Sequence, residues 1–369
     1  MSHAINLPPD NEEKTTMSHA GILIRCAAIA VVAVLTGVSF AQPPKTNDAS
    51  KPTFEPATEK NDVLARFEAL RLGALILDPM LAGEGYWGGR YDEFFKLPTR
   101  PATDYRPTKL DVEGWVSGLA KAGIQYAVCN AKELNGFCLW DSKYTDYDVA
   151  ASAYKTDVLD QFVKACRKHG VAPSFHYCLD KDRYQQRDKR LTEAQYDTYV
   201  HNQIKELMTC YGPLHSIWFS GDSVHDAEIV SSRRRLEDAY ETIKAAQPDC
   251  LVVVHHNGHK PGKGFHRWPT DVYQPSVKLP PTEGHNPRMP HGDKTYYIPY
   301  EVFVRFHATL GGPLHINRPV AEVVQNCREA IQRGASATLL VEVEQDGTLS
   351  QKQVERLLEV KTALKDLLK

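Results

Sequence analysis

The chain has 369 residues, of which 42% are hydrophobic and 24% charged, and its formal net charge is −2. Such a composition is typical of a globular protein with a large buried core. The near-neutral charge gives no electrostatic basis for binding nucleic acid or an anionic membrane surface, so we expect neither partner and favour a small or neutral ligand.

The N-terminal region is predicted to be an export signal. Arg25 precedes an apolar run over residues 26–38, and the triplet Ser-Phe-Ala at 39–41 follows it. Small residues three and one positions before the cut suit signal peptidase, and the apolar run is short for a bilayer crossing. We therefore expect cleavage after Ala41, no membrane span afterwards and a secreted or periplasmic protein. A retained N-terminal anchor is the alternative.

Two further features concern the boundaries of the domain, and a third concerns its cysteines. Met-Ser-His-Ala occurs at Met1 and again at Met17, which makes Met17 an alternative start. Residues 42–60 are rich in Pro, Lys and Thr without periodicity and are predicted to be a flexible linker before a domain over 61–369. Cys26 lies in the signal, and the seven other cysteines contain no C-x-x-C pair, which argues against a disulfide framework or a zinc ribbon and leaves one unassigned disulfide open.

After residue 60, strand patterns alternate with helix patterns. Asp111 and Thr192 are candidate N-caps, and Gly123 and Gly170 are candidate helix stops. Residues 257–298 are rich in Pro, Gly and His and are predicted to form long loops. The predicted strands are 73–77, 125–131, 171–177, 215–219, 251–255 and 337–343, and the predicted helices are 110–123, 155–170, 191–212, 233–248, near 299–310, 320–333 and 351–368.

This alternation predicts a parallel sheet, and the number of units suits a single-domain α/β fold, a (β/α)8 TIM-like barrel. A doubly wound open sheet is the alternative, but no G-x-G-x-x-G follows the first strand, and we expect no cofactor. In a barrel the functional residues lie where the strands end. Acids, imidazoles and aromatic residues at those ends predict a site for a polar ligand: Asp78, Glu133, Asn135, His176, Tyr177, Ser220, Asp222 and His255.

The segment EGWVSGLAKAGIQYAVCNAKELNGFCLWDSKYTDYDV, residues 113–149, resembles the second-strand region of the α-L-fucosidase family of glycoside hydrolases. That region of the family has an Ala-Gly before the strand, then Lys-His-His-Asp-Gly-Phe and Trp-Asp-Ser-x-Tyr-Thr. Weaker resemblance extends over residues 60–350, with segment 66–77 similar to the first strand and segment 203–221 similar to the approach to the fourth. The resemblance implies a catalytic (β/α)8 barrel and a carbohydrate ligand, and leaves no room for the C-terminal β-sandwich of many relatives.

The chain departs from the family pattern at the positions that contact the sugar. Asp78 stands in the first-strand motif where the family has Ile-His-Trp-Gly. Glu133 and Leu134 replace the paired histidines, Asn135 replaces the following Asp, and Ser220 replaces the nucleophilic Asp of Trp-Phe-Asp-Gly. The resemblance and the strand-end pattern together give these candidate substrate-binding residues: Asp78, Asn135, Trp140, His176, Tyr177, Ser220 and His255.

Three carboxylates are candidates for the chemistry. Asp222, two positions after Ser220, suits an inverting geometry with carboxyls about 6.5–9.5 Å apart and a water between them; its alternative is a helix or turn cap. Glu133 is a candidate acid, base or hydroxyl acceptor, and its alternative is a salt bridge with Lys132 or a nearby Arg. Glu283 lies in the long loops, and its alternative is a solvated glutamate. Ser220 has no adjacent base, which favours a ligand hydrogen bond over a nucleophilic role.

The histidine-rich segment does not predict a metal site. The spacing H-H-x-x-H at His255, His256 and His259 contains Gly258 and is followed by Pro261, which prevent the helix that metal-binding pairs use. We therefore interpret the chain as an exported glycosidase of the α-L-fucosidase type with a rearranged active site. The alternative is a non-catalytic carbohydrate-binding pseudoenzyme. The sequence does not indicate the sugar, the linkage or the oligomeric state.

Overall fold

The computed structural model describes residues 54–77, 96–220, 230–306 and 318–368. The predicted signal peptide, the predicted cleavage site, Asp78 and Asp222 lie outside these residues.

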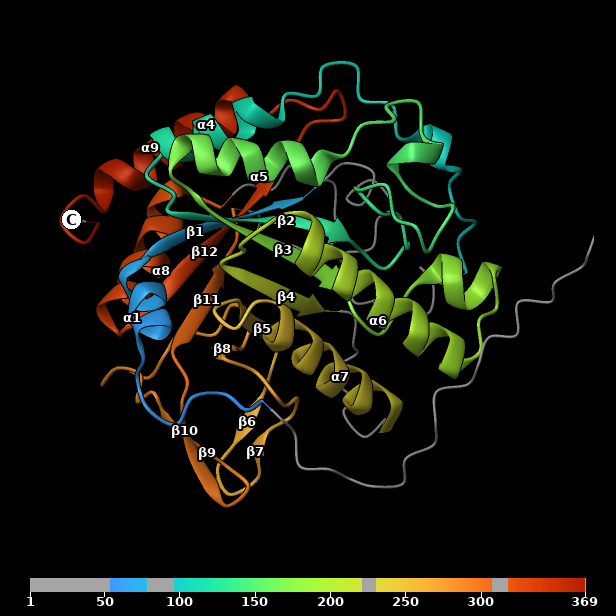
Figure 1. Ribbon diagram of the computed structural model, residues 1–369. Coiled ribbons are helices and arrows are strands. Elements are labelled where there is room, and N and C mark those ends of the chain that lie inside the picture. Colours follow the sequence, from blue (N-terminus) through green and yellow to red (C-terminus); the bar gives the residue numbers. More distant parts are fainter. Residues whose placement is uncertain (1–53, 78–95, 221–229, 307–317, 369) are drawn as a thin grey trace, which may run out of the picture. The chain divides into compact units, whose positions relative to one another are not determined.

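Eight parallel strands form a closed barrel, which confirms the predicted fold class and excludes the open sheet (Figure 1). The barrel closes because β1 pairs with β2 on one side and with β12 on the other, in the order β1-β12-β11-β8-β5-β4-β3-β2. The strands are β1 (Leu72–Leu77), β2 (Tyr126–Lys132), β3 (Ala172–Cys178), β4 (Ser216–Ser220), β5 (Leu251–His255), β8 (Val272–Gln274), β11 (Tyr300–Val304) and β12 (Ala335–Glu342).

Helices surround the strands, and their predicted caps are present (Figure 1). Asp111 accepts a hydrogen bond from Gly114 N, Thr192 and Gln195 form a capping box, and Gly170 takes the left-handed conformation, with φ 67°, that glycine adopts without strain. In the described ranges no helix has the length and apolar composition needed to cross a membrane. The helices are α1 (Asp62–Ala69), α4 (Val112–Lys121), α5 (Val158–His169), α6 (Glu193–Cys210), α7 (Val230–Ala246), α8 (Val320–Gln332) and α9 (Gln351–Ala363), with short turns η1 (Ala102–Asp104), η2 (Val149–Ala151) and η3 (Arg183–Asp188).

Two predictions between residues 257 and 310 are wrong. The helix near 299–310 is instead β11, where Tyr300–Val304 pairs with β8 and β12 and is buried on both faces. The segment 257–298 contains the barrel strand β8 and two hairpins, β6 (His259–Lys260) with β7 (Gly264–Phe265) and β9 (Arg288–His291) with β10 (Lys294–Tyr297). Short apolar runs give little periodicity, so their state is decided by pairing with neighbouring strands.

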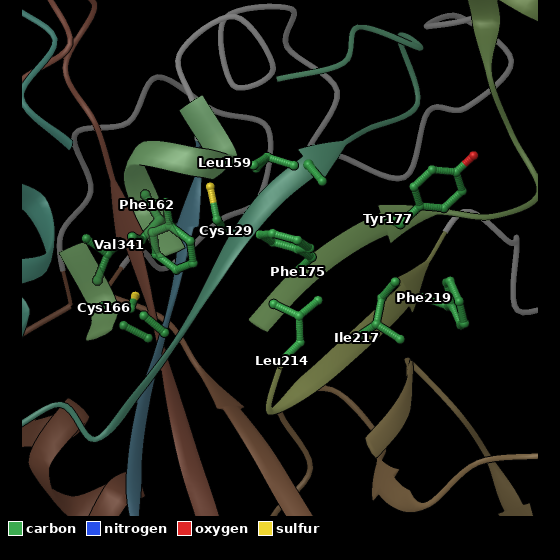
Figure 2. Close-up of a cluster of buried hydrophobic side chains, with 14 of the residues drawn as sticks. Cys129, Leu159, Phe162, Cys166, Phe175, Tyr177, Leu214, Ile217, Phe219 and Val341 are labelled. Atoms are coloured by element: carbon green, nitrogen blue, oxygen red, sulfur yellow. The ribbon is translucent and has the colours of Figure 1, made fainter. Parts of the chain in front are cut away.

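Along each strand, successive side chains alternate between an inner and an outer apolar layer. Trp218 of β4 and Phe303 of β11 pack inside the barrel. Phe175 of β3 and Ile217 of β4 point outward and pack in the layer that also contains Phe162 of α5 (Figure 2). This alternation decides which residue at each strand end points into the barrel.

Helix α1 closes the N-terminal end of the barrel. Leu64 and Phe67 belong to the interior apolar cluster, and the Phe67 ring stacks on the ring of His215, which precedes β4, with centroids 5.9 Å apart. Residues 66–77 therefore hold the end of a helix as well as the first strand. Because α1 fills this end, the polar interior residues of a functional site are left to the C-terminal end of the strands.

The linker predicted over 42–60 is wrong in its last part. Residues 54–60 are held against the barrel domain: Phe54 N donates to Glu241 Oε1 at 2.9 Å, and Tyr297 N donates to Ala57 O at 2.8 Å. The Glu55 carboxylate pairs with Lys294 at 2.6 Å. The remainder of the predicted linker lies outside the described residues.

None of the cysteines that the structure describes takes part in a disulfide, so the disulfide that the sequence left open is not formed among them. Cys129 and Cys178 are buried, as expected for small core residues.

Candidate functional site

Polar side chains collect inside the barrel at the C-terminal ends of its strands. Five of its eight members stand two residues beyond an apolar interior residue, as Ser220 follows Trp218 and His255 follows Val253, so alternation directs these five inward. We call the group the rim cluster, and it consists of Asn130, Glu133, His176, Ser220, His255, His256, Arg305 and Glu342.

Glu133 is the carboxylate of this cluster with the most altered acidity. It directly follows β2 and is 6% exposed, and its Oε2 accepts a hydrogen bond from Leu134 N at 2.8 Å. Burial raises its pKa from 4.5 to about 7, against the lowering effects of the Leu134 amide, Asn130 and Lys132. A carboxyl with this pKa exchanges a proton near neutral pH, which is the property of a general acid or base.

Lys132 does not form the salt bridge with Glu133 that the sequence left open. The pairing of β2 with β3 shifts between Asn130 and Lys132, and the ammonium of Lys132 lies 3.1 Å from Asp182 Oδ2, with both side chains fully buried. The same ammonium lies 4.2 Å from the centre of the Tyr177 ring. Lys132 is therefore ion-paired with Asp182 outside the barrel interior and acts on Glu133 only through its charge, while Glu133 stays with the rim cluster.

His176 is held as a neutral ring beside Asn130. Its Nδ1 lies 3.0 Å from Asn130 Oδ1, and burial, followed by the charge of His256, lowers its pKa to about 3. With a carbonyl oxygen as the partner, Nδ1 carries the proton and Nε2 is left as an acceptor. Such a ring accepts a hydrogen bond from a ligand hydroxyl.

The imidazole rings of His255 and His256 lie against each other, with ring centroids 3.9 Å apart. Burial lowers the pKa of both, and that of His256 falls to about 4, with further lowering by Arg305 and Arg267. His256 has φ 59°, a left-handed conformation that costs a non-glycine residue about 1–3 kcal/mol and recurs at functional sites. The described residues contain no group of three or more His, Cys, Asp or Glu placed to hold a metal.

A second buried glutamate lies away from the rim. Glu301, near the start of β11, has its pKa raised to about 7 by burial, and accepts hydrogen bonds from Tyr126 and, at 2.6 Å, from Thr338. It lies close to the N-terminal end of the barrel interior. An altered pKa alone therefore does not identify a candidate catalytic carboxyl in this fold. Its position at the rim cluster is the feature that distinguishes Glu133 from Glu301.

The structure brings together four of the residues that the sequence singled out: Glu133, His176, Ser220 and His255. Cys178, in register with Ser220 on the neighbouring strand, experiences the charge of Glu133, and His255 experiences that of His176. These couplings, together with the register of Cys178 with Ser220, bring the ends of β2, β3, β4 and β5 into one site.

Three of the predicted ligand contacts make hydrogen bonds within the protein. Trp140 is buried, and its indole N–H donates to Glu206 Oε2 at 2.8 Å. Tyr177 points to the outer layer, where its hydroxyl donates to Gln203 Oε1 at 2.8 Å (Figure 2). Asn135 Oδ1 accepts from Phe137 N at 3.1 Å and so holds the turn after β2.

Glu283 lies at the opposite end of the barrel. It is exposed in a turn, and the nearby His285 N donates to Arg333 O at 2.9 Å, just before β12 begins. The structure therefore does not bring Glu283 together with Glu133.

Sequence reasoning missed Asn130, Arg305 and Glu342. Asn130 and Glu342 stand two residues beyond the interior residues Val128 and Leu340, so a strand periodicity count finds both. Arg305 was hidden because its strand was predicted as a helix. Its guanidinium lies over the Phe303 ring at 5.9 Å and lowers the pKa of His256, which places a cation at the rim.

The comparisons with known proteins agree with the barrel fold. The family model described as Alpha-L-fucosidase matches residues 88–366. Among curated proteins, "Alpha-L-fucosidase 1" of Arabidopsis thaliana is 32% identical over 120 residues, which are 32% of this chain and 23% of that protein. The match thus spans about a quarter of the plant relative.

Solved structures show the same fold. Alpha-L-fucosidase isoenzyme 1 from Paenibacillus thiaminolyticus has 20% identity and a TM-score of 0.64, covering 82% of this chain and 75% of that chain. The GH29 alpha-L-fucosidase of Bacteroides thetaiotaomicron, trapped as a covalent intermediate, has 19% identity and a TM-score of 0.66, covering 85% and 76%. Since the family match covers most of the chain, this chain belongs to the alpha-L-fucosidase family of glycoside hydrolases.

Proposed function

We propose that this protein hydrolyses a glycosidic bond at the rim cluster, with Glu133 as the proton-transferring residue. The observation that carries this proposal is the position of Glu133: a buried carboxyl at a strand end, with its pKa raised to about 7, beside Asn130 and close to neutral histidines. Below that pH the carboxyl holds a proton that it can donate to the leaving oxygen of a glycoside.

Glu342 is the proposed partner carboxylate. It is in register with Leu77 of β1, and Ile76 is in register with Cys129 of β2, so Glu342 and Asn130 stand at the same level on either side of β1. With about 4.8 Å between neighbouring strands, their backbones are about 10 Å apart. Glu133 follows Asn130 by three residues, and we propose that its carboxyl faces that of Glu342 across the rim with room for a water between them, as an inverting mechanism requires.

The remaining rim residues are proposed to bind the sugar. His176 Nε2 accepts a hydroxyl hydrogen bond, and the Arg305 guanidinium donates to hydroxyl oxygens and stabilises the ionised partner carboxylate. Ser220 donates or accepts a hydrogen bond at the end of β4. Asp222, which lies outside the described residues, remains a second candidate for the partner carboxylate.

The second candidate function is carbohydrate binding without hydrolysis. It is favoured by Ser220, because a hydroxyl stands at the strand end where the related enzymes have their nucleophilic acid. In that case the rim cluster would bind the sugar and Glu133 would only accept a hydroxyl hydrogen bond.

Hydrolysis of a panel of aryl glycosides, α-L-fucoside included, tests the proposal with purified protein. Glu133→Gln and Glu342→Gln should each abolish the turnover found. Glu344→Gln, which changes an exposed glutamate just beyond β12, is the matched control and should keep it. Loss in Asp222→Asn but not in Glu342→Gln would reassign the partner carboxylate. No turnover on the panel, together with sugar binding by calorimetry, would favour the binding protein.

We also propose that the protein is exported, as the apolar run and the Ser-Phe-Ala triplet before Gln42 indicate. The intact mass of protein recovered from the periplasm or medium of an expressing bacterium should correspond to a chain that begins at Gln42. Recovery of the uncut chain in the membrane fraction would contradict the proposal.

A further inference from the structure

A pocket of about 210 Å³ lies beside the rim cluster and takes no part in the chemistry proposed above. Its walls come from the first turns of α7, from the β6–β7 hairpin with the loop that follows it, and from the end of β9. Three segments distant in the sequence thus form one concavity of a size that admits a single sugar unit or a charged substituent.

Parallel aromatic rings form one wall of this pocket. The ring of Trp268, which is half-buried, lies 5.6 Å from that of Phe265 with an angle of 24° between their planes. The His291 ring stacks on Trp268 at 4.2 Å and 18°. His291 Nδ1 accepts a hydrogen bond from Phe265 N at 3.1 Å, which fixes the ring in the stack. Flat aromatic faces of this kind pack against the C–H face of a sugar ring.

The rest of the lining is cationic. Arg233, Lys263 and Arg267 line the pocket, and none of the described lining residues is acidic. Arg233 is paired with Glu237 at 3.0 Å, but both side chains are largely exposed, and such a pair neutralises little of its charge in water. Arg267 is buried and held by Asp180 at 2.7 Å. The pocket therefore has cationic side chains beside an aromatic wall.

Arg267 also connects the pocket to the rim cluster. Its backbone N donates to Asn257 Oδ1 at 3.1 Å, and Asn257 follows the rim residue His256 directly. Its charge is one of those that disfavour protonation of His256. The pocket therefore adjoins the rim cluster, on the side where a neighbouring unit of a bound saccharide would lie.

We propose that this pocket is a subsite for an anionic sugar unit, one that carries a sulfate ester or a carboxylate, in the saccharide bound at the rim cluster. The cations recognise the negative group, and Trp268 packs on the ring that carries it. The proposal rests on the proposed function for the identity of the ligand as a saccharide, and adds to it the charge of the substrate.

Calorimetry with three probes tests the subsite: a sulfated fuco-oligosaccharide, its chemically desulfated counterpart and a uronate-containing oligosaccharide. We expect an anionic probe to bind at least about tenfold more tightly than the neutral one at low salt. The double variant Arg233→Ala/Lys263→Ala should remove that preference. The double variant Arg66→Ala/Lys109→Ala, which removes two exposed, ion-paired cations elsewhere, should keep it. Trp268→Ala should weaken the sulfated and desulfated probes alike.

Hydrolysis of a small aryl glycoside separates this proposal from the proposed function, since such a substrate occupies the rim cluster alone. Its turnover should be unchanged in Arg233→Ala/Lys263→Ala. If the protein turns it over but binds neutral and anionic probes equally, or binds neither anionic probe, the subsite is overturned and the function stands. If it turns over nothing but keeps the charge preference, the function fails and the subsite stands.

Discussion

Nδ1 of His176 lies 3.0 Å from Oδ1 of Asn130, a contact that joins β3 to β2 beside Glu133. Asn130→Leu keeps the size of the side chain but removes the partner that orients the His176 ring. Small displacements of substrate-positioning groups cost up to about a hundredfold in rate. By the same argument, we expect kcat/KM to fall by about tenfold to a hundredfold.

Gln203→Leu is the control for Asn130→Leu, because Gln203 is an equally buried amide that bonds Tyr177 on the outer side of the barrel. It should leave kcat/KM within about threefold of the wild type, since it does not touch the rim cluster. Circular dichroism should show both variants folded at the assay temperature. Equal losses in the two variants would mean that Asn130 acts only through the stability of the core.

The pH dependence of kcat/KM follows from the protonation of Glu133. Its pKa is raised to about 7, so the proposed proton donor is present below that pH and lost above it. We expect kcat/KM to fall about tenfold per pH unit above about pH 7. Initial rates at low substrate concentration, taken from about pH 5 to about pH 9, would measure this decrease in kcat/KM. A rate that instead rises through neutral pH would assign Glu133 as a base.

Glu301 should make stability depend on pH without affecting catalysis. Its pKa is about 7 in the folded protein and is expected near the ordinary 4.5 in the unfolded chain. Between these values the folded state holds a proton that the unfolded chain releases, so the free energy of unfolding falls as pH rises. Full ionisation costs about 3 kcal/mol.

Glu301→Gln removes this titration. Urea titrations from about pH 4.5 to about pH 8 give the unfolding free energies of wild type and variant. Their difference should shift in favour of the variant as pH rises. A difference that does not change with pH would contradict the assignment. Glu133 titrates in both proteins, so its contribution cancels.

The Lys132–Asp182 pair is predicted to be essential for stability. Asp182→Asn would leave the fully buried ammonium of Lys132 without its carboxylate, although the hydroxyl of Tyr199 remains beside position 182. Breaking a buried pair on one side costs about 3–5 kcal/mol. Lys132→Met in the Asp182→Asn background should recover part of the loss. Unfolding free energies of the two single variants and the double variant would measure the coupling.

Much of this fold could be predicted from the sequence, because its long elements carry strong local signals. The capping box at Thr192 and the glycine stop at Gly170 place helix ends without reference to the rest of the chain. β8 and β11 carry no such signal. They are three and five residues long, and their strand state depends on pairing with neighbours distant in sequence.

The site was predicted in part for the same reason. The strand-end pattern predicted that Glu133, His176 and His255 lie at one end of the barrel, and the structure places them there, since parallel strands bring their ends together. Tyr177 was predicted as a ligand contact from its position at a strand end, without regard to the face of the strand, and Trp140 from the resemblance to the family. Counting in steps of two from Phe175 shows that Tyr177 points outward. No sequence signal indicated Arg305, because β11 was predicted as a helix.

The measurement that tests the central claim most directly is kcat/KM for Glu133→Gln beside Glu301→Gln. Both replace a buried glutamate whose pKa is about 7 by an isosteric amide, but only Glu133 lies at the rim cluster. Loss of general acid catalysis should lower kcat/KM by about 10²–10⁴-fold in Glu133→Gln, and Glu301→Gln should stay within about threefold of the wild type. Activity retained in Glu133→Gln, or an equal loss in both variants, would contradict the assignment of Glu133 as the proton-transferring residue.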